Sequence, residues 1–146
     1  AHRGVRTGRS VRLLLDTHVL LWLWLEPERL RPDVIDAVTD AANDVLLSVA
    51  SAWEISIKSE LGKLTLPGPA ARWLPAKLAS SAIHVLPIEI DHALRAGALP
   101  PHHRDPFDRM LVAQAIEERM LLVTADEAII PYGAPMLWAG RTAAAP

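Results

Sequence analysis

Short apolar runs alternate along this chain with longer segments of helical pattern, and this alternation constrains the fold more than any other feature. The runs that we expect to form strands are 13–15, 45–49, 85–88, 121–124 and 136–138. The segments that we expect to form helices are 17–25, 32–42, 50–62, 70–81, 92–99 and 106–119. Short, continuous apolar runs are typical of strands that are covered on both faces. The pattern therefore predicts an α/β fold with a mostly parallel sheet and helices on both faces.

The length of 146 residues suits one domain with a sizeable core. We expect that domain over residues 12–140, with flexible tails over 1–11 and 141–146. Hydrophobic residues make up 51% of the chain and charged residues 22%, which excludes an intrinsically disordered protein. The net charge of −2 excludes a protein that binds nucleic acid through bulk basicity, although a local basic patch stays open.

The absence of cysteine limits both the chemistry and the compartment. It excludes a disulfide scaffold, a thiolate zinc site and a cysteine nucleophile, and it fits a reducing cytoplasm.

The longest apolar run, 19–25, is too short to span a membrane. A basic stretch precedes the first apolar run, as in a signal peptide, but Asp16, Thr17 and His18 interrupt that run. We therefore expect a cytoplasmic protein with no membrane association.

Several acidic residues stand where strands end or helices begin. Asp16 ends the first strand, Glu54 follows the second and Asp126 follows the fourth, while Asp105 and Asp108 open the helix 106–119. In an open parallel sheet, ligands bind outside the carboxyl ends of the strands. Asp16, Glu54 and Asp126 are therefore expected at one edge. A helix that leads into a strand is expected here to begin at the opposite edge, unless the loop 100–104 carries its start back to Asp108.

Each acid except Asp16 also has a purely structural interpretation. Ser51 and Glu54 have the spacing of a capping box, and Glu54 can pair with Lys58 one helical turn later. Asp105 before a proline is typical of a helix N-cap, and Asp126 falls in the first turn of another predicted helix start. Asp16 interrupts an apolar segment and has no evident partner in the sequence. Because burying an unpaired carboxylate is costly, a functional role is favoured most strongly for Asp16.

Together the acids point to a metal site. Three or four carboxylates held close together repel one another, and a divalent cation removes that repulsion. An oxygen-only ligand set favours Mg²⁺ or Mn²⁺, which can bind phosphate oxygens and activate a water. The sequence therefore predicts a phosphodiesterase, and without a glycine-rich phosphate loop it does not predict a nucleotide-binding P-loop. Candidates for contacts with substrate phosphate are the following cations and the histidine pair before the 106–119 helix: Lys58, Lys63, Arg104, Arg109, His102 and His103.

Four segments resemble, in order, the motifs of PIN-domain ribonucleases, and most closely those of the VapC toxins of bacterial type II toxin–antitoxin systems. They are LLLDTHVLLW at 13–22, SAWEISIKSELGKL at 51–64, HRDPFDRMLVAQA at 103–115 and LLVTAD at 121–126. The resemblance covers about 13–138 and implies a PIN-like three-layer α/β/α fold. It also implies a Mg²⁺- or Mn²⁺-dependent endoribonuclease that cleaves RNA as a toxin. The implied partners are a VapB-type antitoxin and a second copy of the chain, giving a homodimer and, with antitoxin, a heterotetramer or larger assembly.

The resemblance also assigns site residues. The four acids of the family, catalytic and metal-binding, fall on Asp16, Glu54, Asp108 and Asp126, with Asp105 left as an N-cap or a supporting group. Thr124 matches the hydroxyl residue that often stands near the last acid and is a candidate substrate contact. Ala125 departs from the family, where arginine or lysine often occupies this position. That departure puts in doubt a basic substrate contact at this point, but not the metal site.

Two other functions stay open. A phosphoryl-receiver signalling module also has acids at strand ends, but it needs an adjacent acidic pair after the first strand and a lysine after the last. An inactive PIN-like scaffold is the second alternative, and the presence of all four acids does not favour it.

One further expectation concerns the helix 17–25, which is apolar around nearly its whole circumference. We expect either an exposed patch for a partner on this helix or its complete cover by neighbouring helices.

Overall fold

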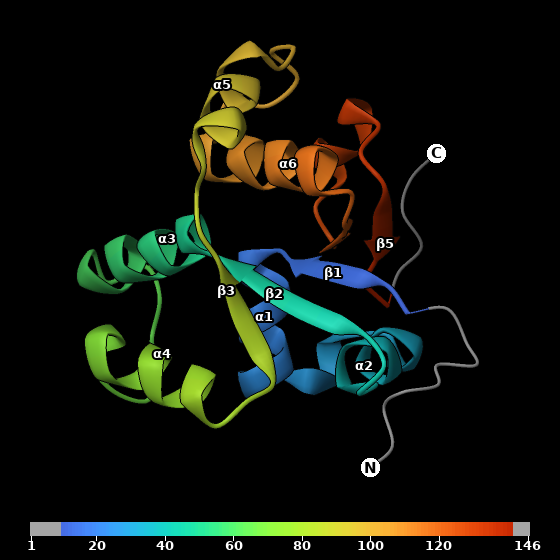
Figure 1. Ribbon diagram of the computed structural model, residues 1–146. Coiled ribbons are helices and arrows are strands. Elements are labelled where there is room, and N and C mark those ends of the chain that lie inside the picture. Colours follow the sequence, from blue (N-terminus) through green and yellow to red (C-terminus); the bar gives the residue numbers. More distant parts are fainter. Residues whose placement is uncertain (1–9, 142–146) are drawn as a thin grey trace.

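One parallel sheet organises the chain, with strand order β3-β2-β1-β4-β5 (Figure 1). The structure is a computed structural model that describes residues 10–141. Of the tails expected at 1–11 and 141–146, residues 1–9 and 142–146 therefore lie outside the described residues. The strands are β1 Arg12–Leu15, β2 Asp44–Ser48, β3 Ile83–Leu86, β4 Leu121–Thr124 and β5 Met136–Trp138. The helices are α1 Thr17–Leu25, α2 Pro32–Thr39, α3 Val49–Glu60, α4 Ala70–Ala79, α5 Ile90–Ala98 and α6 Pro106–Glu118, with two 3₁₀ helices, η1 Pro27–Arg29 and η2 Glu127–Tyr132.

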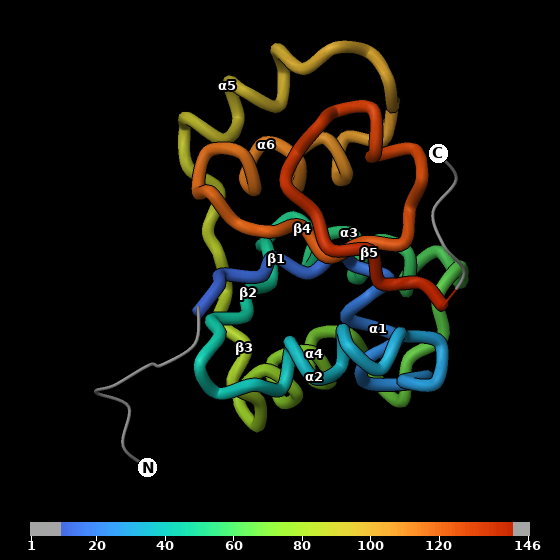
Figure 2. The backbone as a smooth tube through the Cα atoms, turned by 90° about the vertical axis from the view of Figure 1, so that its right-hand side faces the viewer, coloured from blue at the N-terminus to red at the C-terminus, as the bar shows by residue number. Residues whose placement is uncertain are grey.

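The sheet separates two layers of helices, as the sequence predicts for a three-layer α/β/α fold. Figure 2 shows α1, α2 and α4 on one face of the sheet and α5 and α6 on the other. The strand β1 is buried on both faces: Leu13 and Leu15 belong to the apolar core that contains α1, and Leu14 belongs to the core that contains α6. This alternation explains why the strand reads as a continuous apolar run.

The predicted elements are confirmed, with boundaries that differ by a few residues. The helix α1 and the strands β4 and β5 have the predicted limits, whereas β3 begins two residues earlier than expected. The 3₁₀ helix η1 was not predicted. The helix start expected near Asp126 is present as η2, but Asp126 is its N-cap and does not lie in its first turn. The capping box expected at Ser51 and Glu54 is wrong, because α3 begins earlier and its N-cap is Ser48, whose hydroxyl accepts the Ala50 amide. Both residues therefore lie inside the helix, where their side chains are available to the site.

The expectation that α6 would begin at the wrong edge of the sheet is also wrong. A helix between two parallel strands runs antiparallel to them, so it begins at the carboxyl edge and ends where the next strand starts. The helix α6 begins at Pro106 and leads into β4, which pairs in parallel with β1. Its first turn therefore lies at the same edge as Asp16, without a special loop path.

Neighbouring elements cover most of α1. The Trp24 ring meets Trp73 of α4 edge-on at 5.7 Å, and the Arg29 guanidinium lies over the Trp22 ring at 4.6 Å. Among the apolar side chains of α1, only that of the last residue, Leu25, is clearly exposed, at 38%; the polar His18 is exposed as well. The structure is therefore nearer to the second expectation, cover by neighbours, but the cover is not complete, because Trp22, Leu23 and Trp24 are only half-buried. No helix in the described part of the chain is long and apolar enough to cross a membrane.

Candidate active site

Asp16 lies at the carboxyl end of β1, in the centre of the sheet, and is 2% exposed. The Thr124 hydroxyl, at the end of the adjacent strand β4, donates to Asp16 Oδ2 at 2.7 Å. The Asp16 backbone N–H continues the sheet by donating to Val123 O at 2.9 Å. Two neighbouring strands therefore fix both the backbone and the carboxylate of this residue.

Glu54 lies on α3 and is also buried, with 2% exposure. The Thr17 hydroxyl donates to Glu54 Oε1 at 2.7 Å, and the Lys58 ammonium donates to Oε2, as the i, i+4 spacing predicts. The hydrogen bond to Glu54 is the main cause that raises the pKa of Lys58. Glu54 is thus held between a hydroxyl and an ammonium group.

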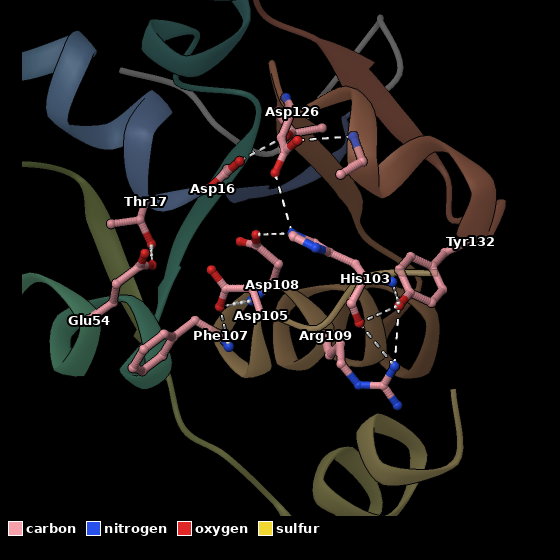
Figure 3. A network of polar contacts seen from close by, with 12 residues as sticks. Asp16, Thr17, Glu54, His103, Asp105, Phe107, Asp108, Arg109, Asp126 and Tyr132 are labelled. Atoms are coloured by element: carbon pink, nitrogen blue, oxygen red, sulfur yellow. Dashed lines mark hydrogen bonds and ion pairs between the residues drawn. The ribbon is translucent and has the colours of Figure 1, made fainter. Parts of the chain in front are cut away.

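Asp108 occupies the first turn of α6, and its carboxylate points toward the other acids (Figure 3). Asp105 is the N-cap of this helix, as predicted: its Oδ1 accepts the amides of Phe107 at 2.9 Å and Asp108 at 3.4 Å. His103 Nε2 lies 2.8 Å from Asp108 Oδ2 and 3.7 Å from Asp126 Oδ2. The imidazole therefore stands between two acids that come from different elements.

Asp126 follows β4 and is the N-cap of η2, where its Oδ1 accepts the Ala128 amide at 2.9 Å. Its side chain is 38% exposed, far more than that of Glu54 at 2%. Asp126 lines a hollow of about 220 Å³ together with Asp16 and His18. A second hollow of about 270 Å³ shares His18 and is lined by Glu54, Lys58 and Lys63.

The electrostatics reflect the crowding of acids. Burial raises the pKa of Asp16 above its ordinary value, and the charges of Glu54 and Asp126 add to the rise against the Thr124 hydrogen bond. Burial likewise raises the pKa of Asp108 to about 7, with contributions from Asp16 and Asp105. Carboxyl groups with raised pKa values are the result expected when burial and like charges both disfavour ionisation.

The site has ligands that suit a divalent cation. His103, Asp105 and Asp108 each offer one ligand atom, and these three atoms lie within 4.8 Å of one another. Asp16 and Asp126 lie near enough to raise the pKa of Asp108. The residues present fit the divalent cation that the family resemblance implies, because a cation would relieve this repulsion and carboxylates are suitable ligands for it.

The predicted substrate contacts fall into two groups. Lys58 and Lys63 line the hollow next to Glu54, and Arg104 is exposed directly before Asp105. Thr124 is fully buried, and its hydroxyl serves Asp16. Arg109 points away from the acids, because its guanidinium donates to backbone carbonyls and to Tyr132. Of these residues, Lys58 and Lys63 are the ones that line a hollow next to an acid of the site.

A set of hydrogen bonds from Arg109 and Tyr132 to the 99–105 loop was not predicted from the sequence. Arg109 Nη2 donates to Ala96 O and Leu99 O at 2.9 Å each, and Nη1 donates to Pro100 O at 3.0 Å. The Tyr132 hydroxyl accepts the His103 amide at 2.9 Å and lies 3.2 Å from the His103 carbonyl oxygen. These contacts place His103 beside Asp108 (Figure 3). The sequence analysis named His103 as a candidate contact with substrate phosphate, whereas the structure places it against Asp108, five residues later in the third motif.

Comparison with known proteins gives one family and several relatives. The family model described as "PIN domain" matches residues 13–133. Ribonuclease VapC22 of Mycobacterium tuberculosis is 31% identical over 124 residues, which are 84% of this chain and 93% of that protein. Ribonuclease VapC16 of the same organism is 45% identical over a shorter segment of 56 residues. That segment spans 38% of this chain and 38% of the relative.

Solved structures give the same fold. The chain is similar to one in a toxin–antitoxin complex from Klebsiella pneumoniae, with a TM-score of 0.58 and 19% sequence identity. The match covers 86% of this chain and 96% of the other. At this identity the likeness shows the architecture alone, and it agrees with the parallel sheet and the two helical layers described above.

Proposed function

This chain belongs to the PIN domain family and, within it, to the VapC group, and from that membership we propose that it is a metal-dependent endoribonuclease that acts as a toxin. The reaction is hydrolysis of RNA phosphodiester bonds. The observation that carries the proposal is the convergence of Asp16, Glu54, Asp108 and Asp126 at one edge of the sheet, where burial and mutual repulsion raise the pKa of Asp16 and Asp108.

Asp16 and Asp108 are the proposed direct ligands of Mg²⁺ or Mn²⁺, with Glu54 and Asp126 completing the acidic pocket. A bound divalent cation would supply charge neutralisation and polarisation of the scissile phosphate. Thr124 orients Asp16 by donating to Oδ2. Asp16 Oδ1 receives no hydrogen bond from the residues that the structure describes, so this oxygen is the one available for a ligand.

Asp126 is the acid that we assign to orienting the attacking water. It is more exposed than Glu54, and it lines the hollow beside Asp16, so water reaches it readily. Glu54 is held between Thr17 and Lys58 instead. We assign Glu54 to holding the Lys58 ammonium at the edge of the site.

Lys58, Lys63 and Arg104 are the proposed contacts with substrate phosphates. Lys58 and Lys63 share one hollow next to the acids, which supports this assignment. A protein with a net charge of −2 needs such local cations, because its overall charge does not attract RNA. Arg109 and Thr124 are left out of this set, since their polar groups are bonded within the protein.

The partners that we propose are an antitoxin and a second copy of the chain, both acting with it in the cytoplasm. The matched chain from Klebsiella pneumoniae comes from a toxin–antitoxin complex, which supports the first. Exposed apolar side chains support the second. Apart from Leu25, the large apolar side chains exposed in the described part of the chain lie on or beside α3, β3 and α5: Val49, Trp53, Leu61, Val85, Ile88, Ile90 and Leu94.

The experiment that tests the proposal is cleavage of RNA by the wild-type chain with Mg²⁺ or Mn²⁺ and with EDTA. Asp16→Asn is expected to abolish cleavage while the fold is kept or slightly stabilised, because the substitution removes like-charge repulsion. Thermal melting checks the fold. Activity that persists in EDTA would overturn the metal dependence.

The same assay decides between the proposal and the remaining alternative. A wild-type chain that is folded, binds its partner and cleaves no RNA with either metal would be the inactive PIN-like scaffold. The phosphoryl-receiver alternative is not retained, because the chain belongs to the PIN family and Thr17 stands where that module needs a second acid.

A further inference from the structure

His103 is the histidine that the structure holds against the acids of the site. Its Nε2 is 2.8 Å from Asp108 Oδ2 and 3.7 Å from Asp126 Oδ2, and its side chain is 23% exposed. The nitrogen that faces these carboxylates is thus at the place where both of them converge. The neighbouring His102 behaves differently, because its ring packs edge-on against Tyr132 at 5.1 Å.

The backbone of His103 is fixed by Tyr132, 29 residues away, and by Arg109 in the helix that follows. The Tyr132 hydroxyl, on η2, accepts its amide, and Arg109 Nη1 donates to its carbonyl oxygen at 3.4 Å. Arg109 also ties the preceding loop through the carbonyls of Leu99 and Pro100. These hydrogen bonds hold the loop, and with it the side chain of His103, in place before any ligand binds. Precise metal–ligand geometry requires such preorganisation.

The chemistry of the donors distinguishes this site from an oxygen-only one. Carboxylate oxygens suit Mg²⁺ and Mn²⁺ alike, whereas an imidazole nitrogen favours a transition-metal ion over Mg²⁺. His103, Asp105 and Asp108 offer one nitrogen and two oxygens within 4.8 Å of one another. The sequence analysis expected acidic residues alone to bind the metal. It therefore omitted His103, whose ring nitrogen lies beside Asp108.

We propose that His103 Nε2 is a ligand of the divalent cation and that the site consequently prefers Mn²⁺ to Mg²⁺. This inference rests on the proposed metal-dependent function and narrows the identity of the metal. The competing interpretation is that His103 only braces Asp108 through a hydrogen bond. The two interpretations differ in whether a nitrogen atom of His103 contacts the metal ion, and this contact can be measured directly.

The test uses the full chain, freed of metal and titrated with Mn²⁺, with electron paramagnetic resonance as the readout. Loss of the free-ion signal gives the affinity, and electron spin-echo modulation reports ¹⁴N bound to the ion. The wild type is expected to show ¹⁴N modulation, and His103→Ala is expected to lose it together with about tenfold or more of the Mn²⁺ affinity. Mg²⁺ affinity, measured by calorimetry, is expected to be weaker than that of Mn²⁺ in the wild type.

Two other histidines serve as matched controls. His102→Ala is expected to keep the modulation, and so is His18→Ala, although His18 lines the hollow with Asp16 and Asp126. Absence of ¹⁴N modulation from the Mn²⁺-loaded wild type would overturn the inference without any variant. Loss of the signal in His18→Ala but not in His103→Ala would overturn it as well.

Cleavage of RNA measured on the same samples separates this inference from the proposed function. A wild type that cleaves RNA with Mn²⁺ but shows no bound nitrogen refutes the role of His103 and leaves the metal-dependent ribonuclease intact. A wild type that binds neither ion and cleaves RNA in EDTA refutes the metal dependence itself.

Discussion

The Thr124 hydroxyl and the Asp16 carboxylate are joined by a hydrogen bond of 2.7 Å, although 108 residues separate them in the sequence. Both residues are buried, at 0% and 2% exposure. Thr124 is the last residue of β4, and Asp16 directly follows the neighbouring parallel strand β1. The bond opposes the effect of burial on the pKa of Asp16. Thr124 thereby keeps the central carboxylate of the site oriented and closer to its ionised form.

Replacing Thr124 tests this relationship. Thr124→Val keeps the volume and removes the hydroxyl, so the pKa of Asp16 is expected to rise further and divalent-cation affinity to fall about 10- to 100-fold. Thr124→Ser keeps the donor and is expected to retain most of the affinity. Calorimetric titration of both variants with Mn²⁺ measures the effect. Equal affinities for the two variants would show that Thr124 matters only for packing.

Substitutions of the neighbouring acids Asp105 and Asp108 are expected to have different effects: one lowers stability and the other lowers activity. Asp105 caps α6 through the amides of Phe107 and Asp108, so Asp105→Ala should cost about 0.5–2 kcal/mol of stability. Asp108→Ala should abolish RNA cleavage with little loss of stability, because it removes a repelled carboxylate. Denaturant melts and cleavage rates on both variants check this. If Asp105→Ala eliminated cleavage without lowering stability, Asp105 would be the third acid.

The raised pKa of Asp108 predicts a pH dependence for the metal-free protein. The folded state holds this proton up to about pH 7, whereas the unfolded chain releases it near the ordinary value of 3.8. Between these values the folded state binds more protons, so the stability that this proton contributes is lost as pH rises toward 7. Thermal melts in EDTA across this window should show a decline that Asp108→Asn reduces. An unchanged slope in that variant would assign the decline to other groups.

Arg109 is expected to act on the site only through the 99–105 loop. Lysine at this position cannot reach the carbonyls of Ala96, Leu99 and Pro100 together, so Arg109→Lys should lose about 2 kcal/mol of stability. It should also weaken Mn²⁺ binding by displacing His103. An exposed arginine elsewhere, Arg72, provides the control, since Arg72→Lys should change neither property. Normal metal affinity in a destabilised Arg109→Lys would mean that the loop does not position His103.

The fold was largely predictable because local patterns and tertiary structure agree. The strands β1 and β4 are continuous apolar runs that are buried on both faces, and helix starts such as Asp105 before Pro106 have clear capping residues. The acids at the strand ends followed from the same reasoning. The edge at which α6 begins was predicted wrongly because the direction of a helix between two parallel strands was misjudged. The sequence itself contained no misleading signal.

The supporting groups of the site could not be predicted, because long-range contacts create them. Nothing near His103 in the sequence indicates that Tyr132, 29 residues later, fixes its backbone. Thr17 meets Glu54 across 37 residues in the same way. The sequence left open whether α1 is exposed or covered for a similar reason: Trp24 of α1 packs against Trp73 of α4, a contact that depends on how the helices pack.

The surface for a second protomer is therefore expected on the β3 edge of the sheet, at α5, instead of on α1. Ile90 and Leu94 are 74% and 69% exposed one helical turn apart, and exposed apolar side chains of this size are typical of interfaces. Ile90→Glu and Leu94→Glu should place like charges in the contact and reduce the mass in light scattering to the 16.0 kDa of one chain. Leu25→Glu is the control, because Leu25 is exposed at the far end of α1 and should leave a dimer intact. A dimer that persists in both α5 variants and dissociates in Leu25→Glu would return the interface to α1, where the apolar pattern of the sequence first suggested it.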